Sequence, residues 1–269
     1  EVGTIYERRI STLKNWLESG EERFTQAEKD FMIQKYKELK TPFYYEYMDG
    51  WAALLQNIST FILMLALVIG FLVSGIFSDE FQTKADSIFF SARFGRSKGI
   101  SAKVGAGFCI ATGFYLMFVF LYTFIVLFIL GADGANCPIQ LDLWRSVYNI
   151  TFLQAYLFIV LGGYIGTIFA ATLGMLASAF THSTPTAVIV PFIVLCAFPF
   201  LSRIITLPGL CSFFPDQLLE IYLDIKEAGL ITLGSKVTTI ATVIVPVYAV
   251  VCLIFQPILY RVYQKVEIK

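Results

Sequence analysis

The sequence predicts an all-α fold, a polytopic bundle of membrane helices. Of its 269 residues, 57% are hydrophobic and 15% are charged, and the mean hydropathy is +0.71. Such values are typical of multi-spanning membrane proteins. A bilayer core needs about 20 apolar residues per helix, and five segments reach or approach that length: residues 58–77, 104–130, 155–180, 188–204 and 238–260. The chain therefore divides into a helical N-terminal region, residues 1–57, and a transmembrane domain, residues 58–269.

The N-terminal region is expected to form two helices between residues 5 and 40. Thr25 and Glu28 have the spacing of a capping box, which predicts the start of the second helix. The first helix is predicted by an apolar stripe that ends near Gly20: Ile5, Ile10, Leu13, Trp16 and Leu17. An aromatic run typical of a membrane interface then leads into the first span: Phe43, Tyr44, Tyr45, Tyr47 and Trp51.

The positions of Lys and Arg predict the orientation of the spans, because basic residues close to span ends face the cytoplasm. The connector between the first two predicted spans, residues 78–103, carries five of them: Lys84, Arg93, Arg96, Lys98 and Lys103. Three more follow the last span, so the connector and the C-terminus are predicted to be cytoplasmic and residues 1–57 to lie outside the cell membrane. An outside start predicts a further span upstream of Glu1, and hence six spans in the parent protein.

Three later features have alternative interpretations. Pro191 and Pro199 predict a kink or a tight turn in the short segment 188–204, and a re-entrant segment is the alternative. Residues 205–237 contain an amphipathic pattern that predicts a short helix at the outer interface, either a lid or a simple surface helix. Cys137 and Cys211 both fall in predicted outward connectors, on the oxidising side, and are candidates for a disulfide.

A stripe of small residues marks one face of the third predicted span. Its members are spaced by four, so they share one side of a helix and allow a second helix to approach closely: Gly162, Gly166, Ala170 and Gly174. The stripe predicts either packing within one subunit or a contact between two copies.

The sequence also excludes several kinds of chemistry. The predicted spans hold no ionisable residue except Arg203 at a border, which argues against a proton-coupled carrier, a redox pump and an intramembrane hydrolase. The pattern GxxxxGK[ST] is absent, so the chain has no P-loop. The cysteine spacing suggests no metal site, and the single histidine, His182, is expected to be solvated in a short turn. With 20 basic and 20 acidic residues, no charge bias favours nucleic acid.

The connector has the pattern of an amphipathic helix followed by a basic corner. On a helix, its apolar residues fall on one face: Phe81, Ala85, Ile88, Phe89 and Ala92. Arg93, Gly95, Arg96, Lys98 and Gly99 then predict a flexible corner before Lys103 opens the next span. An ordinary cytoplasmic loop with an interfacial helix is the alternative to a docking site.

These residues resemble a known family. An acid directly after a span (Glu80), a short amphipathic helix, and then Arg-Phe-Gly-Arg-Ser-Lys and an Ala-Lys pair (Ala102, Lys103) resemble the first cytoplasmic connector of ABC transporter permeases of the type-2 export class. The six inferred spans and the amphipathic segment before the last span are similar as well. One departure concerns the Gly-Thr pair that the family often has four to five residues after the acid, where this chain has Lys84 and Ala85.

The resemblance implies a function. In that family the connector docks onto a separate cytoplasmic ATP-binding subunit, and two permeases and two ATPases form the exporter. The resemblance assigns ATPase coupling to eight residues of this chain: Glu80, Phe81, Asp86, Ile88, Phe89, Arg93, Arg96 and Lys103.

We therefore expect a permease subunit that moves an amphiphilic peptide, antibiotic or lipid-like compound outward. The expected partners are the ATPase, a second permease and membrane lipid. The chain itself is expected to be neither an enzyme nor a cofactor-binding protein, because its partner would bind ATP and Mg²⁺. A membrane sensor or assembly factor that binds an extracellular ligand through residues 1–57 is the alternative.

Overall fold

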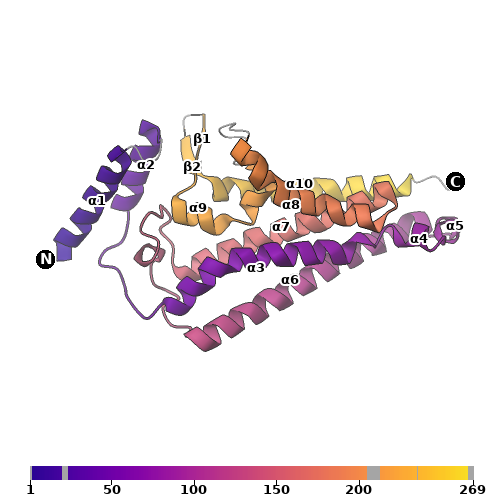
Figure 1. Ribbon diagram of the computed structural model, residues 1–269, viewed down its shortest axis with the longest axis horizontal. Coiled ribbons are helices and arrows are strands. Elements are labelled where there is room, and N and C mark those ends of the chain that lie inside the picture. The colour runs from indigo at the N-terminus through magenta and orange to yellow at the C-terminus, as the bar shows by residue number, and fades with distance from the viewer. Residues whose placement is uncertain (1, 20–23, 205–212, 235, 266–269) are drawn as a thin grey trace.

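The computed structural model describes residues 2–19, 24–204, 213–234 and 236–265. Long helices lie side by side in one elongated bundle (Figure 1). Its members are α3 (Asp49–Ser74), α6 (Ile100–Leu130), α7 (Phe152–Thr181), α8 (Thr184–Ile204) and α10 (Ile240–Gln264). Four helices, α3, α6 with the turn before it, α7 and α10, are long and apolar enough to cross a membrane.

These four helices overlap four of the five predicted spans, although α3 ends at Ser74, before residue 77, and α10 begins at Ile240, after residue 238. The helix α3 begins at Asp49 because polar residues such as Gln56 and Asn57 extend a helix without interrupting it. The predicted span at 188–204 lies within α8, of which the described apolar part, Thr184–Ala197, is shorter than the other four.

The helix α7 is the centre of the bundle, since it packs against α3, α6, α8 and α10. Its small residues let the segment between α8 and α10 approach closely as well. A Cβ atom added at Gly162 would lie 2.0 Å from Ile221, and one added at Gly166 would lie 2.5 Å from Leu219. The stripe of small residues is therefore used for packing inside the chain, and all of its members are buried: Gly162, Gly166, Ala170 and Gly174.

The segment between α8 and α10 differs from the single amphipathic helix that the sequence predicts. Its described part forms a 3₁₀ turn, η4 (Pro215–Leu218), the short helix α9 (Ile221–Glu227), and two antiparallel strands, β1 (Leu230–Leu233) and β2 (Lys236–Thr239). Gly234, with φ +63°, lies in the turn between the strands, where glycine adopts a positive φ without steric cost. The predicted all-α helical bundle is confirmed, and this two-stranded hairpin is a local addition that the sequence did not predict.

The two predicted N-terminal helices are confirmed as α1 (Val2–Ser19) and α2 (Gln26–Lys37). Both hydrogen bonds of the capping box form between Thr25 and Glu28. The two helices lie at one end of the bundle, beside the β hairpin (Figure 1). Leu13 of α1 and Met32 of α2 are fully buried in a small core that they share with the hairpin region and with the loop between α6 and α7.

Two arginines attach this N-terminal region to the rest of the chain. Arg9 of α1 donates a hydrogen bond to the carbonyl of Gln140 at 3.0 Å, and its guanidinium lies 4.8 Å from the ring centroid of Phe43. Arg145, in the loop between α6 and α7, lies 4.6 Å from the ring of Trp16. Such cation–π contacts contribute about 1 kcal/mol each when partly exposed, so the N-terminal helices are held against the bundle.

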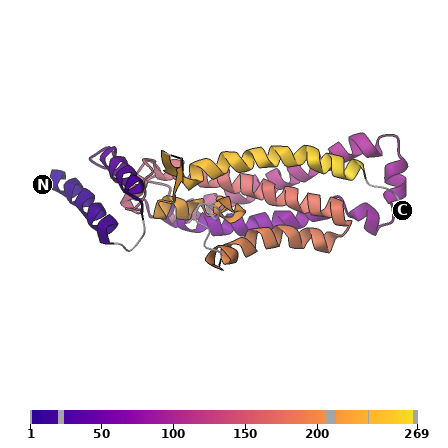
Figure 2. The same cartoon turned by 90° about the horizontal axis from the view of Figure 1, so that it is seen from above.

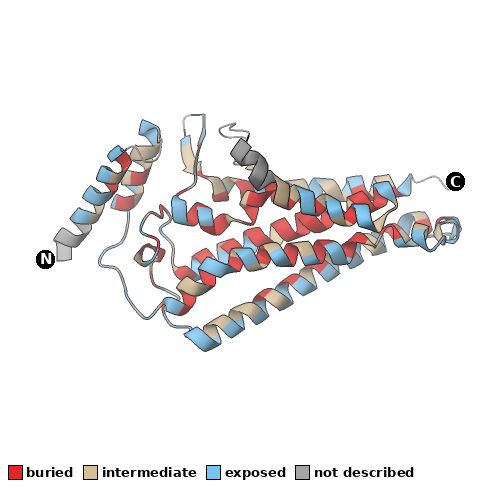
Figure 3. Cartoon of the chain, in the orientation of Figure 1, coloured by how far each residue is buried: buried red, intermediate tan, exposed pale blue. Residues whose placement is uncertain are grey.

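The part of the connector that precedes α6, residues 78–99, lies at the opposite end of the bundle, as the view turned by 90° shows (Figure 2). We call this the connector end and the other the N-terminal end. Burial is greatest along α7 and least along α6, much of whose surface is exposed (Figure 3).

A buried carboxyl lies near the N-terminal end. Asp224 of α9 is 7% exposed, and its Oδ2 has no hydrogen-bond partner among the described residues. Its pKa is raised from 3.8 to about 7, mainly by burial and to a smaller extent by the nearby carboxylates of Glu220, Glu227 and Asp216. In the unfolded chain the same group would ionise near pH 4.

The buried Asp224 predicts a pH dependence of stability. Because its pKa is higher in the folded state, its protonated form favours folding below about pH 4, and this contribution is lost as the pH rises from about 4 to about 7. The substitution Asp224→Asn should therefore raise the melting temperature at pH 8 and reduce the change between pH 5 and pH 8, as measured by thermal unfolding in detergent. Asp133→Asn, at an exposed position, is the matched control, and equal effects of the two substitutions would contradict the prediction.

Candidate functional site

The connector consists of three short helical pieces instead of one amphipathic helix. These are α4 (Asp79–Gln82), α5 (Asp86–Ser91) and a π-helical turn, η1 (Gly95–Gly99), which leads directly into α6. Lys84, with φ +56°, separates α4 from α5. A residue in the left-handed region cannot continue a right-handed helix, so α4 and α5 are separate helices. The prediction of one helix with one continuous apolar face is therefore wrong.

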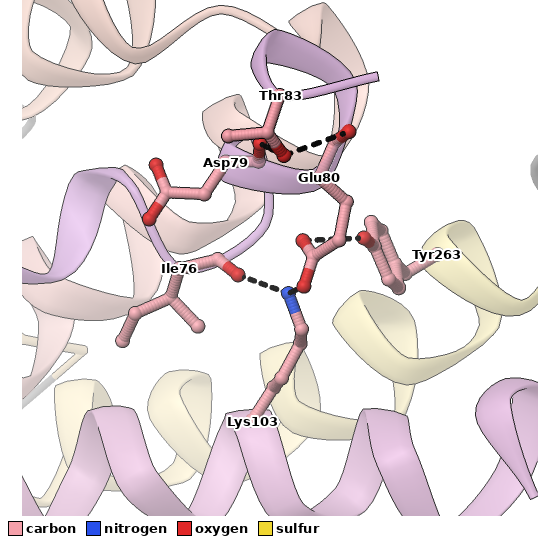
Figure 4. Close-up of polar contacts among 6 residues, drawn as sticks. All are labelled: Ile76, Asp79, Glu80, Thr83, Lys103 and Tyr263. Atoms are coloured by element: carbon pink, nitrogen blue, oxygen red, sulfur yellow. Dashed lines mark hydrogen bonds and ion pairs between the residues drawn. The ribbon is translucent and has the colours of Figure 1, made fainter. Parts of the chain in front are cut away.

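An ion pair between Glu80 and Lys103 joins the connector to the bundle (Figure 4). Their side chains are only 19% and 16% exposed. The ammonium of Lys103 also donates a hydrogen bond to the carbonyl of Ile76, and the hydroxyl of Tyr263 donates one to Glu80 Oε2 at 3.4 Å. One charge cluster thus links the end of α3, the helix α4, the start of α6 and the end of α10.

Aromatic rings surround this ion pair. The Lys103 Nζ lies 5.6 Å from the ring centroid of Phe77, 5.1 Å from that of Phe89 and 5.6 Å from that of Tyr263. Phe77 and Tyr263 are fully buried, and their rings meet edge to face at 4.6 Å. The rings shield the ion pair from water, which strengthens its electrostatic attraction, and each adds a cation–π contact.

The connector is also attached to the turn between α7 and α8. The hydroxyls of Ser78 and Thr184 share a hydrogen bond at 2.6 Å, and Gln82 Nε2 donates one to Thr184 Oγ1 at 2.8 Å. The ring of His182 stacks on that of Phe81 with centroids 3.8 Å apart. The expectation that His182 is a solvated turn residue is wrong, because its ring packs against the connector and its Nε2 atom is buried.

The predicted flexible corner is packed against the end of α10. Arg96 donates a hydrogen bond to the carbonyl of Gln264 at 3.0 Å, and its guanidinium lies 4.9 Å from the ring of Phe90. Gly95 is buried, and a Cβ atom added there would lie 1.8 Å from the carbonyl oxygen of Phe89. The corner therefore depends on the absence of a side chain at Gly95 and not on backbone flexibility.

Other side chains of the connector are exposed, and they are apolar or basic. Ile88 is 73% exposed and Phe94 is 49% exposed. Arg93 and Lys98 are exposed as well, and both lie over the ring of Phe94, at 5.2 Å and 4.9 Å from its centroid. This exposed face consists of Ile88, Arg93, Phe94 and Lys98.

The eight residues assigned to ATPase coupling therefore fall into distinct places. Ile88 and Arg93 belong to the exposed face, whereas Asp86 is half-buried at the start of α5. The other five form the attachment to the bundle: Glu80, Phe81, Phe89, Arg96 and Lys103.

Several residues of this attachment were not predicted as site residues. Tyr263, Phe77, Phe90 and Thr184 come from four different segments, and only the fold brings them together. An aromatic residue three positions after the last predicted span is the one sequence signal that would have indicated Tyr263.

Outside the connector, the cysteines and possible metal ligands form no further site among the described residues. Cys137 is buried, and its Sγ lies 3.9 Å from the carbonyl oxygen of Glu46. Cys211 lies outside the described residues, so its pairing with Cys137 stays a prediction. Within the described part of the chain, no group of three or more His, Cys, Asp or Glu side chains is arranged to hold a metal ion.

The ion pair at the connector should contribute much more stability than an exposed pair. Lys103→Met leaves the carboxylate of Glu80 among aromatic rings without its partner, so we expect a loss of about 3 kcal/mol. The double variant Glu80→Gln/Lys103→Met should recover part of this loss, as measured by denaturant or thermal unfolding. Lys35→Met, which breaks the more exposed Lys35–Glu38 pair, should cost less than about 1 kcal/mol. Additive losses at Glu80 and Lys103 would contradict the coupling.

The packing at Gly95 gives a second prediction. Gly95→Ala places a methyl group against a backbone carbonyl that cannot move independently, and should cost about 1–3 kcal/mol. Gly105→Ala in α6 is the control, because nothing lies within 4 Å of its added Cβ atom. Melting temperatures of the two variants in the same detergent make the comparison, and equal values would show that the corner tolerates a side chain.

Comparisons with known proteins supply no family for this chain. No family model, no curated protein and no solved structure matches it.

Proposed function

We propose that this chain is the membrane subunit of an ATP-driven exporter of the ABC type and that its connector receives force from a separate cytoplasmic ATPase. The observation that carries the proposal is the two-sided connector. One side presents Ile88 and Arg93 to solvent, while the other is joined by ion pair, hydrogen bonds and ring contacts to the bundle.

The two sides of the connector fit the requirements of a transmission element. A docking face needs exposed apolar and basic groups, because apolar anchors and Arg are enriched at protein interfaces. A transmission also needs rigid attachment, since a displacement at a loose loop would be absorbed locally. An ordinary cytoplasmic loop needs neither a shielded ion pair nor a buried glycine.

The backbone at Lys84 also supports the resemblance to type-2 permeases. In that family a Gly-Thr pair often follows the acid by four to five residues, and glycine readily adopts a positive φ. Here Lys84 occupies the first of these positions and has φ +56°. The chain therefore keeps a bend where the family's glycine would allow one, although the residue differs.

The proposal also covers the orientation of the chain in the membrane, its partner subunits and its cargo. The connector and C-terminus face the cytoplasm, the N-terminal helices lie outside the cell membrane, and a second permease completes the exporter. ATP and Mg²⁺ bind to the partner subunit. An amphiphilic cargo suits the bundle, because the predicted spans hold no Asp, Glu, Lys, Arg or His except Arg203 and so offer few partners for a strongly charged one.

Substitutions on the exposed face test the docking. The variants Ile88→Asp and Arg93→Glu should each reduce co-purification of the ATPase and its stimulation in proteoliposomes by about tenfold, as expected for interface hot spots. Both should leave the melting temperature unchanged, because neither side chain belongs to the attachment. Arg261→Glu, at an exposed site near the end of α10, controls for charge reversal alone. A chain that purifies without any ATPase and stimulates none would refute the proposal.

A sensor or assembly factor is the second candidate, and a cavity at the N-terminal end favours it. This cavity of about 470 Å³ lies between the end of α2 and the loop before α7. It contains the side chain of Gln140, which is 3% exposed and has an Oε1 atom without a hydrogen-bond partner among the described residues. Deletion of residues 2–40 separates the two functions, because a sensor would lose all activity whereas an exporter would keep nucleotide-dependent transport.

A further inference from the structure

The segment between α8 and α10 is seated on α7 by two side chains that fill the space left by glycines. Ile221, the first residue of α9, is buried against Gly162, and Leu219, just before it, is buried against Gly166. The helix α9 also contacts α3 and α10 and lies near the N-terminal end of the bundle (Figure 1). It therefore covers part of three helices that are long and apolar enough to cross a membrane.

This segment buries two carboxyl groups. Asp224 of α9 is 7% exposed and Asp216 of η4 is 4% exposed, and each has one carboxyl oxygen without a hydrogen-bond partner among the described residues. The other oxygen of Asp224 lies so close to Gly229 that a Cβ atom added there would be 2.5 Å from it. An ionised carboxylate that leaves water needs donors or a counter-charge. The surroundings of Asp224 suit its protonated form.

The titratable groups that face Asp224 from its own segment are acidic. Its pKa is raised mainly by burial and to a smaller extent by the carboxylates of Glu220, Glu227 and Asp216. The loop before α7 adds Tyr148, whose pKa is raised mainly by burial and also by Asp224. Like charges and an uncharged phenol therefore oppose the ionisation of Asp224 while α9 is seated.

Basic groups do not offset these acids. Lys226 of α9 and Arg145 of the loop line a cavity at this end, but neither forms an ion pair with Asp224 in the part of the chain that the structure describes. Of the helices that contact α9, α7 holds no charged residue, α3 holds only Asp49 and α10 holds only Arg261. An ionised Asp224 would gain solvation only by moving toward water.

One side of α9 leaves room for such a movement. A cavity of about 250 Å³ lies between α9 and α3, and Gln56, Thr60 and Lys226 are among its lining residues. The helix is therefore held most closely on its α7 side, where Ile221 meets Gly162. Loss of that contact would free α9 without separating the long helices from one another.

We propose that η4 and α9 form a pH-dependent lid, which stays seated on Gly162 and Gly166 while Asp224 is protonated and lifts when this carboxyl releases its proton to water. The lid does not depend on ATP-driven export, because its carboxyls and its seat belong to one chain. In the proposed orientation this end of the bundle faces outward, so the external pH would set the position of the lid.

Hydrogen–deuterium exchange of the full chain in nanodiscs tests the lid. Peptides that cover residues 219–228 should exchange about 80-fold faster at pH 8 than at pH 5, after correction for the intrinsic pH dependence of exchange. This ratio follows from linkage for a carboxyl whose pKa is about 4 in water and about 7 when α9 is seated. Peptides of α7 should keep their protection at both pH values. A parallel loss of protection in α7 would show global unfolding and would overturn the proposal.

Three variants separate titration from packing. Asp224→Asn should keep the slow exchange of pH 5 at both pH values, because the amide does not ionise. Asp142→Asn, at an exposed position of the loop that lines the cavity with Lys226, is the matched control and should keep the full ratio. Ile221→Ala weakens the seat on Gly162, so it should raise exchange at both pH values and leave the ratio between them unchanged.

Three results would contradict the lid. The first is exchange of α9 in the unmodified chain that does not depend on pH, a measurement that no folding defect of a variant can affect. The second is a full pH ratio in Asp224→Asn. The third is protection that returns at pH 8 when Ca²⁺ is added, because the carboxyls would then bind a cation in place of a proton.

Discussion

The ion pair between Glu80 and Lys103 is the interaction on which the connector end of this protein depends. It connects the first helix of the connector to α6 at a place where Tyr263, Phe77 and Phe89 exclude water. A charge pair in such surroundings is favourable only when both partners are present, because either one alone would remain desolvated. The pair therefore fixes the geometry of the connector more strictly than apolar contacts alone would.

This constraint explains why the connector has two chemically different sides. The inward side needs an acid, a lysine and aromatic rings in fixed positions, and Gly95 allows the chain to turn closely enough to supply them. The outward side has no such requirement and keeps exposed apolar and basic groups. Attachment and recognition are thus divided between neighbouring residues of one short segment, which is what a proposed docking element requires.

Much of the fold could be predicted from the sequence, and the failures have identifiable causes. Apolar runs located the spanning helices, and the capping box of Thr25 and Glu28 located α2, because both signals are local. The connector was predicted as one helix because periodicity does not reveal that Lys84 adopts a positive φ. The hairpin β1–β2 was missed because four-residue strands carry a weak pattern beside the amphipathic signal of α9. His182 joined the site through a tertiary contact that no local signal encodes, and Tyr263 through one that only its position just after the last predicted span indicates.

Because α6 is long, a small movement at its connector end would produce a larger movement at its other end. This helix has 31 residues and is therefore about 46 Å long. It begins at the connector, and its surface is exposed along much of the bundle (Figure 3). A tilt of about 5° at its connector end would displace its far end by about 4 Å, on the basis of that length. A small rotation at the Glu80–Lys103 pair would therefore become a displacement of side-chain size at the opposite end of α6.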